Sequence, residues 1–327
     1  MKLSFIRGCF PSNLSVFVKP FISTNLLRPV CFSSMSSPLT SLKLQIPLFL
    51  RPPLHSASVS DLQKWHDWTK NLASSVGTTF LDSDDGPDSD LLCRELKWLM
   101  EDAIEDRTVF SQMGIENNQT NQRIEERRPF QYLVEFEHWR DLVLSVQDGV
   151  LIPRPETELI VHLVADVVSN NEGLKEGLWA DLGTGSGALA IGIGRILGSC
   201  GRDVIELRRG SWFKPLKDVE GKLAGIVSNP PYIPSDNILG LQAEVGRHEP
   251  RLALDGGLNG MDDLFHLCNG ASLMLRPGGF FIFETNGEKQ CKCLAKYIEN
   301  DIRGSFHSLD MVSDFAGIQR FLTGFCQ

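Results

Sequence analysis

The chain has 327 residues, of which 42% are hydrophobic and 22% are charged, so its composition allows a normal buried core and excludes a protein that is disordered throughout. Asp and Glu outnumber Lys and Arg by 41 to 32, and the formal net charge of -9 argues against a general nucleic-acid or anionic-membrane binder, although it does not exclude a local basic groove. No run of about 18 apolar residues occurs, so no membrane span is expected.

The first 57 residues have a composition of their own. Residues 1–60 contain no Asp or Glu, six Lys or Arg and twelve Ser. An acid-free, Ser-rich and mildly basic start is typical of an organellar transit peptide, and an ordinary disordered tail is the alternative. We therefore expect residues 1–57 to be a disordered transit peptide outside the fold, and the small number of Arg favours a plastid over a mitochondrion.

The next segment has helical periodicity. Apolar and aromatic residues recur at helical spacing over Ser58–Val76, an acidic stretch at Asp82–Asp90 interrupts the pattern, and Leu91–Ile104 resumes it. These patterns predict a small helical domain over residues 58–127, ending in a polar linker at Glu116–Arg128. Its tryptophan stripe is read as core, with a partner surface as the alternative. The stripe consists of Trp65 and Trp68 among Leu62, Leu72 and Val76.

Strand-like residues within the connector 128–150 are split by Arg140 and Asp141, which indicates a hairpin. The remaining residues, 151–327, alternate between apolar strands and amphipathic helices. That alternation predicts an α/β domain with a doubly wound parallel sheet, closed by a final antiparallel hairpin. After a first helix near Leu159–Val168, the expected strands are Leu178–Leu182, Val204–Leu207, Leu223–Ser228 and Phe280–Glu284, the hairpin is Ser305–Val312 with Ile318–Thr323, and further helices lie at Ala188–Leu197, Asp262–Leu275 and Glu288–Asn300.

A glycine-rich turn follows the first of these strands. Glycines in Asp181-Leu-Gly-Thr-Gly-Ser-Gly187 let the backbone approach a ligand, and the following helix offers free N–H groups to it. The spacing G-x-G-x-G directly after an acid differs from the dinucleotide pattern G-x-G-x-x-G. An acid at Asp181 suits a positively charged sulfonium cofactor better than a pyrophosphate. A turn that only packs the strand against the helix is the alternative.

The strand Leu223–Ser228 delivers Asn229, Pro230, Pro231 and Tyr232 to the carboxyl edge of the sheet, where open α/β sheets place their ligands. Prolines lack N–H groups, so this turn is stiff and presents acceptors. The Asn229 side-chain oxygen and the Pro230 carbonyl can accept both hydrogens of one planar NH2 group, and Tyr232 can stack on it. Such a tetrad suits methyl transfer to an amide or amino-purine nitrogen.

With these motifs the sequence resembles the protein-(glutamine-N5) methyltransferases that modify the GGQ glutamine of translation release factors. The resemblance covers about Arg128–Thr323, and more loosely the helical segment, which in that family helps to hold the release factor. DNA adenine methylases share the tetrad but not Arg154-Pro-Glu-Thr-Glu158. The matching pieces are Leu151–Glu158, the glycine loop, Gly210–Phe213, Asn229–Ile233, His248–Asp255, Gly260 and Met261.

The resemblance implies a Rossmann-like class I methyltransferase fold, S-adenosylmethionine as the cofactor and a release factor as the partner. We expect the chain to be a monomer. It implies that Asn229 and Tyr232, with the two prolines, hold the substrate glutamine and that Trp212 lies against the adenine of the cofactor. The implied cofactor-binding residues are Asp181, Gly183, Thr184, Gly185, Ser186, Gly187, Trp212 and Asn229.

One part of the family pattern is missing. Only 23 residues separate Gly187 from Ser211, whereas a helix, a strand, a second helix and a second strand need about 40. The interpretation is that the second strand and its helix are lost, and with them the acid that holds the cofactor ribose. Asp203 and Glu206 are the acids left nearby, but Asp203 would start a strand, at the wrong edge for that role.

Three functions stay open. The first is N5-methylation of a release-factor glutamine by direct displacement, without a covalent enzyme intermediate. The second is N6-adenine methylation of RNA or DNA, which the net charge of -15 after residue 60 disfavours. The third is a catalytically impaired isoform that only binds the release factor.

Catalytic or metal-binding roles are not favoured for the other reactive residues. The acids Glu244, Glu249 and Asp255, and His248, follow the tetrad and could shape the pocket, but solvated or capping roles are favoured for them. The eight cysteines show no metal-ligand spacing, so they are expected to be reduced thiols and no metal is expected.

Overall fold

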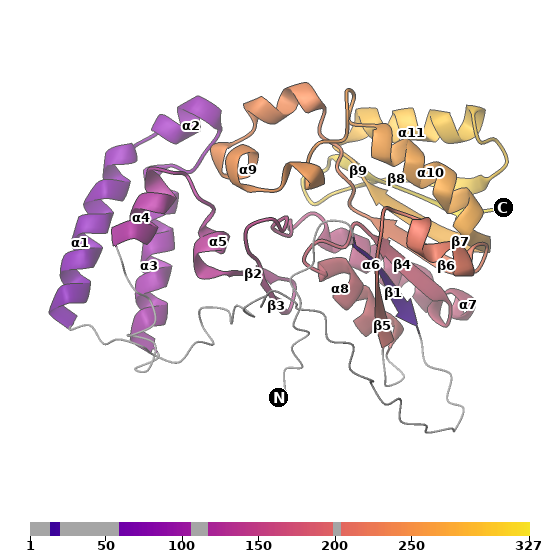
Figure 1. Ribbon diagram of the computed structural model, residues 1–327, viewed down its shortest axis with the longest axis horizontal. Helices are drawn as coiled ribbons and strands as arrows, with labels where there is room; N and C mark the ends of the chain where they lie inside the picture. The colour runs from indigo at the N-terminus through magenta and orange to yellow at the C-terminus, as the bar shows by residue number, and fades with distance from the viewer. Residues whose placement is uncertain (1–13, 20–58, 106–116, 199–203) are drawn as a thin grey trace, which may run out of the picture.

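The computed structural model describes residues 14–19, 59–105, 117–198 and 204–327. A group of helices lies at one end of the molecule and a sheet covered by helices at the other, with α9 (Ala243–His248) between them (Figure 1). Within the described residues, no helix is long and apolar enough to cross a membrane.

The helical part forms around its own small core. As predicted, α1 (Val59–Val76) and α3 (Ser89–Glu105) are amphipathic helices, and they pack against each other. The acidic stretch between them holds the end of a short helix, α2 (Thr79–Asp84). The tryptophan stripe divides, since Trp65 packs against the core whereas Trp68 is 40% exposed. The buried core residues are Ala73, Val76, Leu92, Leu96 and Ile124.

The prediction of a linker at Glu116–Arg128 is wrong. That segment contains α4 (Asn117–Ile124), and the side chains of Arg123 and Arg127 are buried. The polar composition suggested exposure, but these arginines are paired with carboxylates, which is the condition under which charges are buried.

The connector contains the predicted hairpin. After α5 (Phe130–Val134), β2 (Phe136–Trp139) and β3 (Leu142–Ser145) pair antiparallel, with Arg140 in a left-handed turn at φ +55°. A turn then leads into α6 (Glu158–Ser169) and α7 (Glu172–Lys175).

The sheet has seven strands in the order β5-β1-β4-β6-β7-β9-β8, and the α/β class is confirmed. Strands β4 (Leu178–Leu182), β6 (Leu223–Ser228) and β7 (Leu275–Glu284) are parallel, and β9 (Gln319–Cys326) and β8 (Phe306–Ser313) close one edge as the predicted antiparallel hairpin. β7 begins before the predicted Phe280, and its register shifts irregularly against β6 across residues 276–279.

The sheet is mixed rather than parallel, because β1 (Leu14–Lys19) runs antiparallel between β4 and β5 (Val204–Arg209). Val16 of β1 lies opposite Asp181 on one side and Leu207 on the other. This strand departs from the expectation that residues 1–57 lie outside the fold. Its sequence, LSVFVK, contains the β-branched and aromatic residues that strands favour.

Helices cover both faces of the sheet. On one face α10 (Asp262–Met274) and α11 (Glu288–Asn300) pack over one core, and on the other α6, α7 and α8 (Ala188–Leu197) pack over a second. In β7, Phe281 and Phe283 face the first core and Phe280 and Ile282 the second, as strand alternation requires. The connections after β5 and β6 contain the short 3-10 helices Lys214–Val219, Ser235–Gly240 and Arg251–Ala253.

Candidate active site

The glycine loop lies between β4 and α8. Gly183, Gly185 and Gly187 all have left-handed backbones, at φ +76°, +55° and +86°, which residues with a side chain rarely adopt. Gly187 is the residue before α8, so the first N–H groups of this helix are at the loop. Among the other predicted loop residues, Thr184 is buried and its hydroxyl donates to the Asp181 carbonyl at 3.1 Å, whereas Ser186 is half-buried.

Asp181 is the last residue but one of β4, just before this loop. Its side chain is 2% exposed, and neither carboxylate oxygen has a hydrogen-bond partner among the described residues. Burial raises the pKa of this carboxyl group to about 7, and the nearby Ala190 N–H and Thr184 hydroxyl lower it only in part. A buried carboxylate without a partner is costly, so its position beside the glycine loop marks a place for a ligand donor or cation.

The loop, Trp212 and Asn229 converge at one point. A Cβ atom on Gly183 would lie 3.6 Å from the Trp212 ring and 3.9 Å from the Asn229 carbonyl oxygen. The Ser228 hydroxyl donates to the Leu182 carbonyl at 2.7 Å, which ties β6 to β4 at this edge of the sheet. The structure thus brings together three of the elements that the sequence singled out separately.

Trp212 is held in an unusual conformation. Its backbone has φ +46°, and its indole N–H donates to Asp263 of α10 at 3.0 Å. The next residue, Phe213, lies against α10 where Gly270 has no side chain, because a Cβ there would be only 1.9 Å from the Phe213 ring. These contacts fix the Trp212 ring near the loop and restrict its movement.

The tetrad turn is packed firmly. Pro230 is buried, and its carbonyl accepts no hydrogen bond from the described part of the chain. Pro231 is half-buried, and its carbonyl oxygen would lie 2.7 Å from a Cβ on Gly256. The Tyr232 carbonyl accepts a hydrogen bond from the Gln290 side chain at 2.8 Å. Gln290 thus uses the acceptor capacity of the Tyr232 carbonyl, whereas that of the Pro230 carbonyl is left unused within the described residues.

Two residues that sequence reasoning missed lie behind the tetrad. The Asn229 side-chain N–H donates to the Thr157 hydroxyl at 3.1 Å, and this hydroxyl donates to Glu284 at 2.8 Å. The Tyr232 hydroxyl donates to the other oxygen of Glu284 at 3.2 Å. Burial raises the pKa of Glu284 to about 7 and raises the pKa of Tyr232. An available signal was that Glu284 ends the strand next to β6, at the edge where ligands bind.

The acids after the tetrad are not solvated, so the favoured reading was wrong for two of them. Glu249 is buried and accepts from Arg154 at 2.5 Å and from the Ile152 N–H at 3.1 Å. Glu244 is buried between two arginines. Asp255 does have a capping role, since it accepts from the Ser235 hydroxyl at 2.6 Å and from the Gly257 N–H at 3.1 Å.

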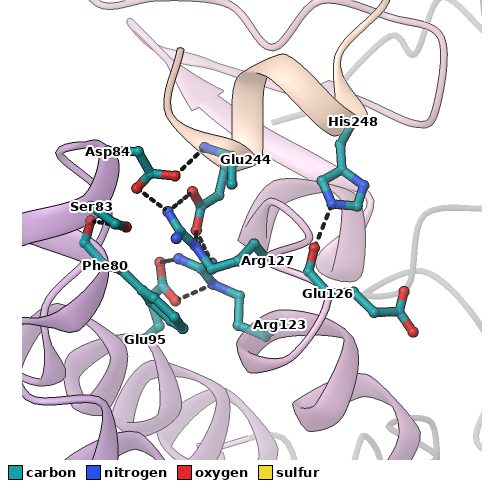
Figure 2. Close-up of polar contacts among 10 residues, drawn as sticks. Phe80, Ser83, Asp84, Glu95, Arg123, Glu126, Arg127, Glu244 and His248 are labelled. Carbon is teal, nitrogen blue, oxygen red and sulfur yellow. Dashed lines mark hydrogen bonds and ion pairs between the residues drawn. The ribbon is translucent and has the colours of Figure 1, made fainter. Parts of the chain in front are cut away.

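Glu244 belongs to an ion-pair network that joins α9 to the helical part of the molecule (Figure 2). Arg127 donates to Glu244 at 2.6 Å and to Asp84 at 3.0 Å, and Arg123 donates to Glu244 at 2.9 Å and to Glu95 at 2.7 Å. Although burial opposes it, these hydrogen bonds hold the pKa of Glu244 below its usual value. Nearby, the His248 ring contacts the Glu126 carbonyl at 2.8 Å.

Of the two acids considered for the ribose, Asp203 lies outside the described residues. Glu206 is on β5 and accepts from Arg208 at 2.8 Å. Within the described residues, no group of three or more His, Cys, Asp or Glu is placed to hold a metal ion.

The fold and this site define an α/β protein with a glycine-rich loop beside a turn of polar acceptor groups at the carboxyl edge of its parallel strands. No family model matches the chain. It is similar to release factor glutamine methyltransferases of Synechocystis sp. (37% identity over 228 residues, covering 62% of this chain and 74% of the relative), Thermosynechococcus vestitus (38% over 226 residues, 61% and 75%) and Gloeobacter violaceus (37% over 223 residues, 61% and 75%). The chain belongs to the release factor glutamine methyltransferase family, which makes it an N-methyltransferase.

Proposed function

We propose that this chain uses S-adenosylmethionine to methylate the N5 atom of the GGQ glutamine in an organellar peptide chain release factor. The observation that carries the proposal is the convergence of the glycine loop, Trp212 and Asn229 at the carboxyl edge of β4 and β6. In this proposal the sheet is a Rossmann-like class I methyltransferase sheet, a plastid is the favoured compartment, and the chain acts as a monomer.

The residues present fit the cofactor. Three left-handed glycines leave room for a ligand against the backbone, and the carboxylate of Asp181 has no partner within the described residues. A sulfonium compound with an amino group would supply both a positive charge and a donor near this carboxylate. When bound, S-adenosylmethionine supplies an electrophilic methyl group. Residues Gly183–Gly187 and Asp181 would hold it, and Trp212 would lie against its adenine.

The tetrad would orient the substrate nitrogen. The Asn229 side-chain oxygen and the Pro230 carbonyl accept the two hydrogens of the glutamine amide, so its nitrogen lone pair is directed toward the reacting carbon. These acceptors become stronger partners as positive charge develops on the nitrogen. The hydrogen bond between Tyr232 and Glu284 fixes the tyrosine ring, which packs on the amide plane.

The interpretation that a strand–helix unit is missing stands against this proposal. The alignment with the Synechocystis relative spans 228 positions, whereas 62% of 327 residues is about 203 residues, so this chain has gaps in the alignment. Such gaps support the interpretation of a missing unit. In the strand order, the place beside β4 that the lost strand would take is held by β1. This observation favours a second candidate function, an impaired isoform that only binds the release factor.

The test is calorimetry of S-adenosylmethionine with the full chain, followed by mass spectrometry of a GGQ release factor after incubation. We expect binding, and one methyl group on the GGQ glutamine. A release factor without that glutamine should gain none, and methylation of an adenine-containing oligonucleotide instead would support the nucleic-acid alternative. Binding of the release factor without cofactor binding would support the impaired isoform. A version with a strand–helix unit restored after Ser199 is the positive control.

A further inference from the structure

The half-buried side chain of Asn229 and two buried side chains behind it, Thr157 and Glu284, form a continuous series of hydrogen bonds. It runs from Asn229 Nδ2 to Thr157 Oγ1 at 3.1 Å and from Thr157 Oγ1 to Glu284 Oε2 at 2.8 Å. Thr157 is 5% exposed and Glu284 is 1% exposed, so water does not compete for the bond between them. Thr157 precedes α6, Asn229 follows β6 and Glu284 ends β7, so the chain spans three elements.

A hydroxyl group carries a single proton, which gives this chain a direction. Because Thr157 donates its proton to Glu284, it can only accept from Asn229. Asn229 must then turn its NH2 group toward Thr157, and its Oδ1 atom points the other way. The direction matters because the two ends of an asparagine side chain differ only in hydrogen bonding, and a substrate NH2 group needs the oxygen.

We propose that Thr157 and Glu284 are positioning residues that fix the Asn229 amide with Oδ1 toward the substrate nitrogen. This inference rests on the proposed function, because it takes the substrate to be a carboxamide whose NH2 group is held by acceptors. Neither residue touches the substrate in this scheme. They act through Asn229, and the carboxylate of Glu284 sets the direction of both hydrogen bonds, from Asn229 to Thr157 and from Thr157 to Glu284.

The scheme requires that Oε2 of Glu284 carries no proton, and ionisation of the carboxyl group secures this. A proton on Oε2 would donate to Thr157, whose own proton would then point to Asn229, and the amide would have to present its oxygen to Thr157. The NH2 group of Asn229 would face the substrate NH2 group, and two donors cannot bond. Burial raises the pKa of Glu284 to about 7, while Arg320 of β9 lowers it in part and Glu156 opposes that effect. Arg320 is itself paired with Asp314.

The variants separate this role from a structural one. Thr157→Val replaces the hydroxyl by a methyl group of similar size, and we expect kcat to fall about 10²-fold with KM for the release factor within about threefold, because orientation rather than binding is lost. Thr157→Ser keeps the hydroxyl and should restore kcat to within a few-fold. Thr285→Val is the matched control, since this equally buried hydroxyl bonds to Gly287 and Arg320 carbonyls and not to the tetrad.

Glu284→Gln tests the carboxylate. Its side-chain oxygen can still accept from Thr157 while its NH2 group faces Tyr232, so we expect partial activity. In the unmodified chain kcat should fall at low pH as Glu284 becomes protonated, and this acid limb of the pH profile should be absent in Glu284→Gln. Unchanged kcat in Thr157→Val, or an unchanged acid limb in Glu284→Gln, would overturn the proposal.

A readout independent of turnover keeps this inference distinct from the proposed function. The side-chain NH2 signals of Asn229 in 15N-labelled full-length protein are assigned by their loss in Asn229→Asp. We expect them to shift in Thr157→Val, to stay in place in Thr157→Ser and Thr285→Val, and to move with pH in a way that Glu284→Gln abolishes. Identical signals in Thr157→Val and the unmodified chain would refute the positioning role even if no release factor is methylated. If the Asn229 signals behave as expected in all of these variants but no release factor is methylated, only the proposed function is refuted.

Discussion

The two polar ends of the Asn229 side chain have different partners: Nδ2 donates to Thr157, and in the proposed function Oδ1 accepts from the substrate amide. Asn229→Ala should therefore lower the methylation rate by at least about 10²-fold, the typical effect of removing one preorganised polar group from a reacting centre. Initial rates from mass spectrometry of the release factor measure this. Asn237→Ala, an exposed asparagine a few residues further on, should leave the rate unchanged. A wild-type rate in Asn229→Ala would remove the tetrad from the mechanism.

Asp181 gives the ligand-free protein a pH dependence of known sign. Its pKa of about 7 lies above the unfolded value near 4, so between these values the folded state holds a proton that the unfolded state has lost. The contribution of Asp181 to the free energy of unfolding is therefore complete below about pH 4 and is lost as the pH rises to 7. Urea midpoints should fall between pH 5 and pH 8. This window lies above the range in which carboxylates with lowered pKa values, such as Glu244, lose their contribution. Because Glu284 has a shift of the same sign, Asp181→Asn should reduce the slope without abolishing it. The exposed Asp236→Asn should not change the slope.

At the scale of elements, β1 is the strand that connects β5 to β4. Proline cannot donate a hydrogen bond in a ladder, so Val16→Pro, opposite both Asp181 and Leu207, should lower the thermal midpoint by several degrees and weaken cofactor binding. Differential scanning calorimetry and titration calorimetry measure the two effects. A chain that lacks only residues 1–13 keeps β1 and is the control. If Val16→Pro melts and binds like the unmodified chain, β1 does not stabilise the cofactor edge.

The same elements show what the sequence could predict. β4 and β6 are buried along most of their length, and such strands appear as continuous apolar runs bounded by turn residues. The hairpin β8–β9 and the helices α8, α10 and α11 were predicted from local patterns too. β1 could not be predicted this way, because its pairing is long-range and the segment around it has the composition of a targeting peptide.

The residues of the site also fall into those that the sequence could predict and those that it could not. The glycine loop and the tetrad are local motifs, so their positions could be inferred from spacing alone. Thr157 and Glu284 are ordinary residues in ordinary contexts, and only the fold brings them to within hydrogen-bond distance of Asn229 and Tyr232. Arg123 and Arg127 were assigned to a linker, because burial of a charge depends on partners far away in the sequence.

At the scale of the whole molecule, the network around Glu244 decides how the helical part is held against the rest (Figure 2). Arg127→Ala would leave two carboxylates, Glu244 and Asp84, without one of their partners, and breaking a buried pair in this way costs about 3–5 kcal/mol. We expect the thermal transition to split or shift downward. Arg128→Ala, which breaks the more exposed pair with Asp148, should cost at most about 1 kcal/mol. Equal effects of the two variants in calorimetry would show that the network does not hold the two parts together.

The position of β1 also bears on how the chain could be processed. Removal of residues 1–57, as expected of a transit peptide, would take away this strand and leave β4 and β5 each with an unpaired row of backbone groups. Unpaired edges of this kind are templates for association with other chains. Cleavage after β1 and retention of this sheet are therefore mutually exclusive fates for one polypeptide, and the length of the N-terminus found in cells would tell which fate it follows.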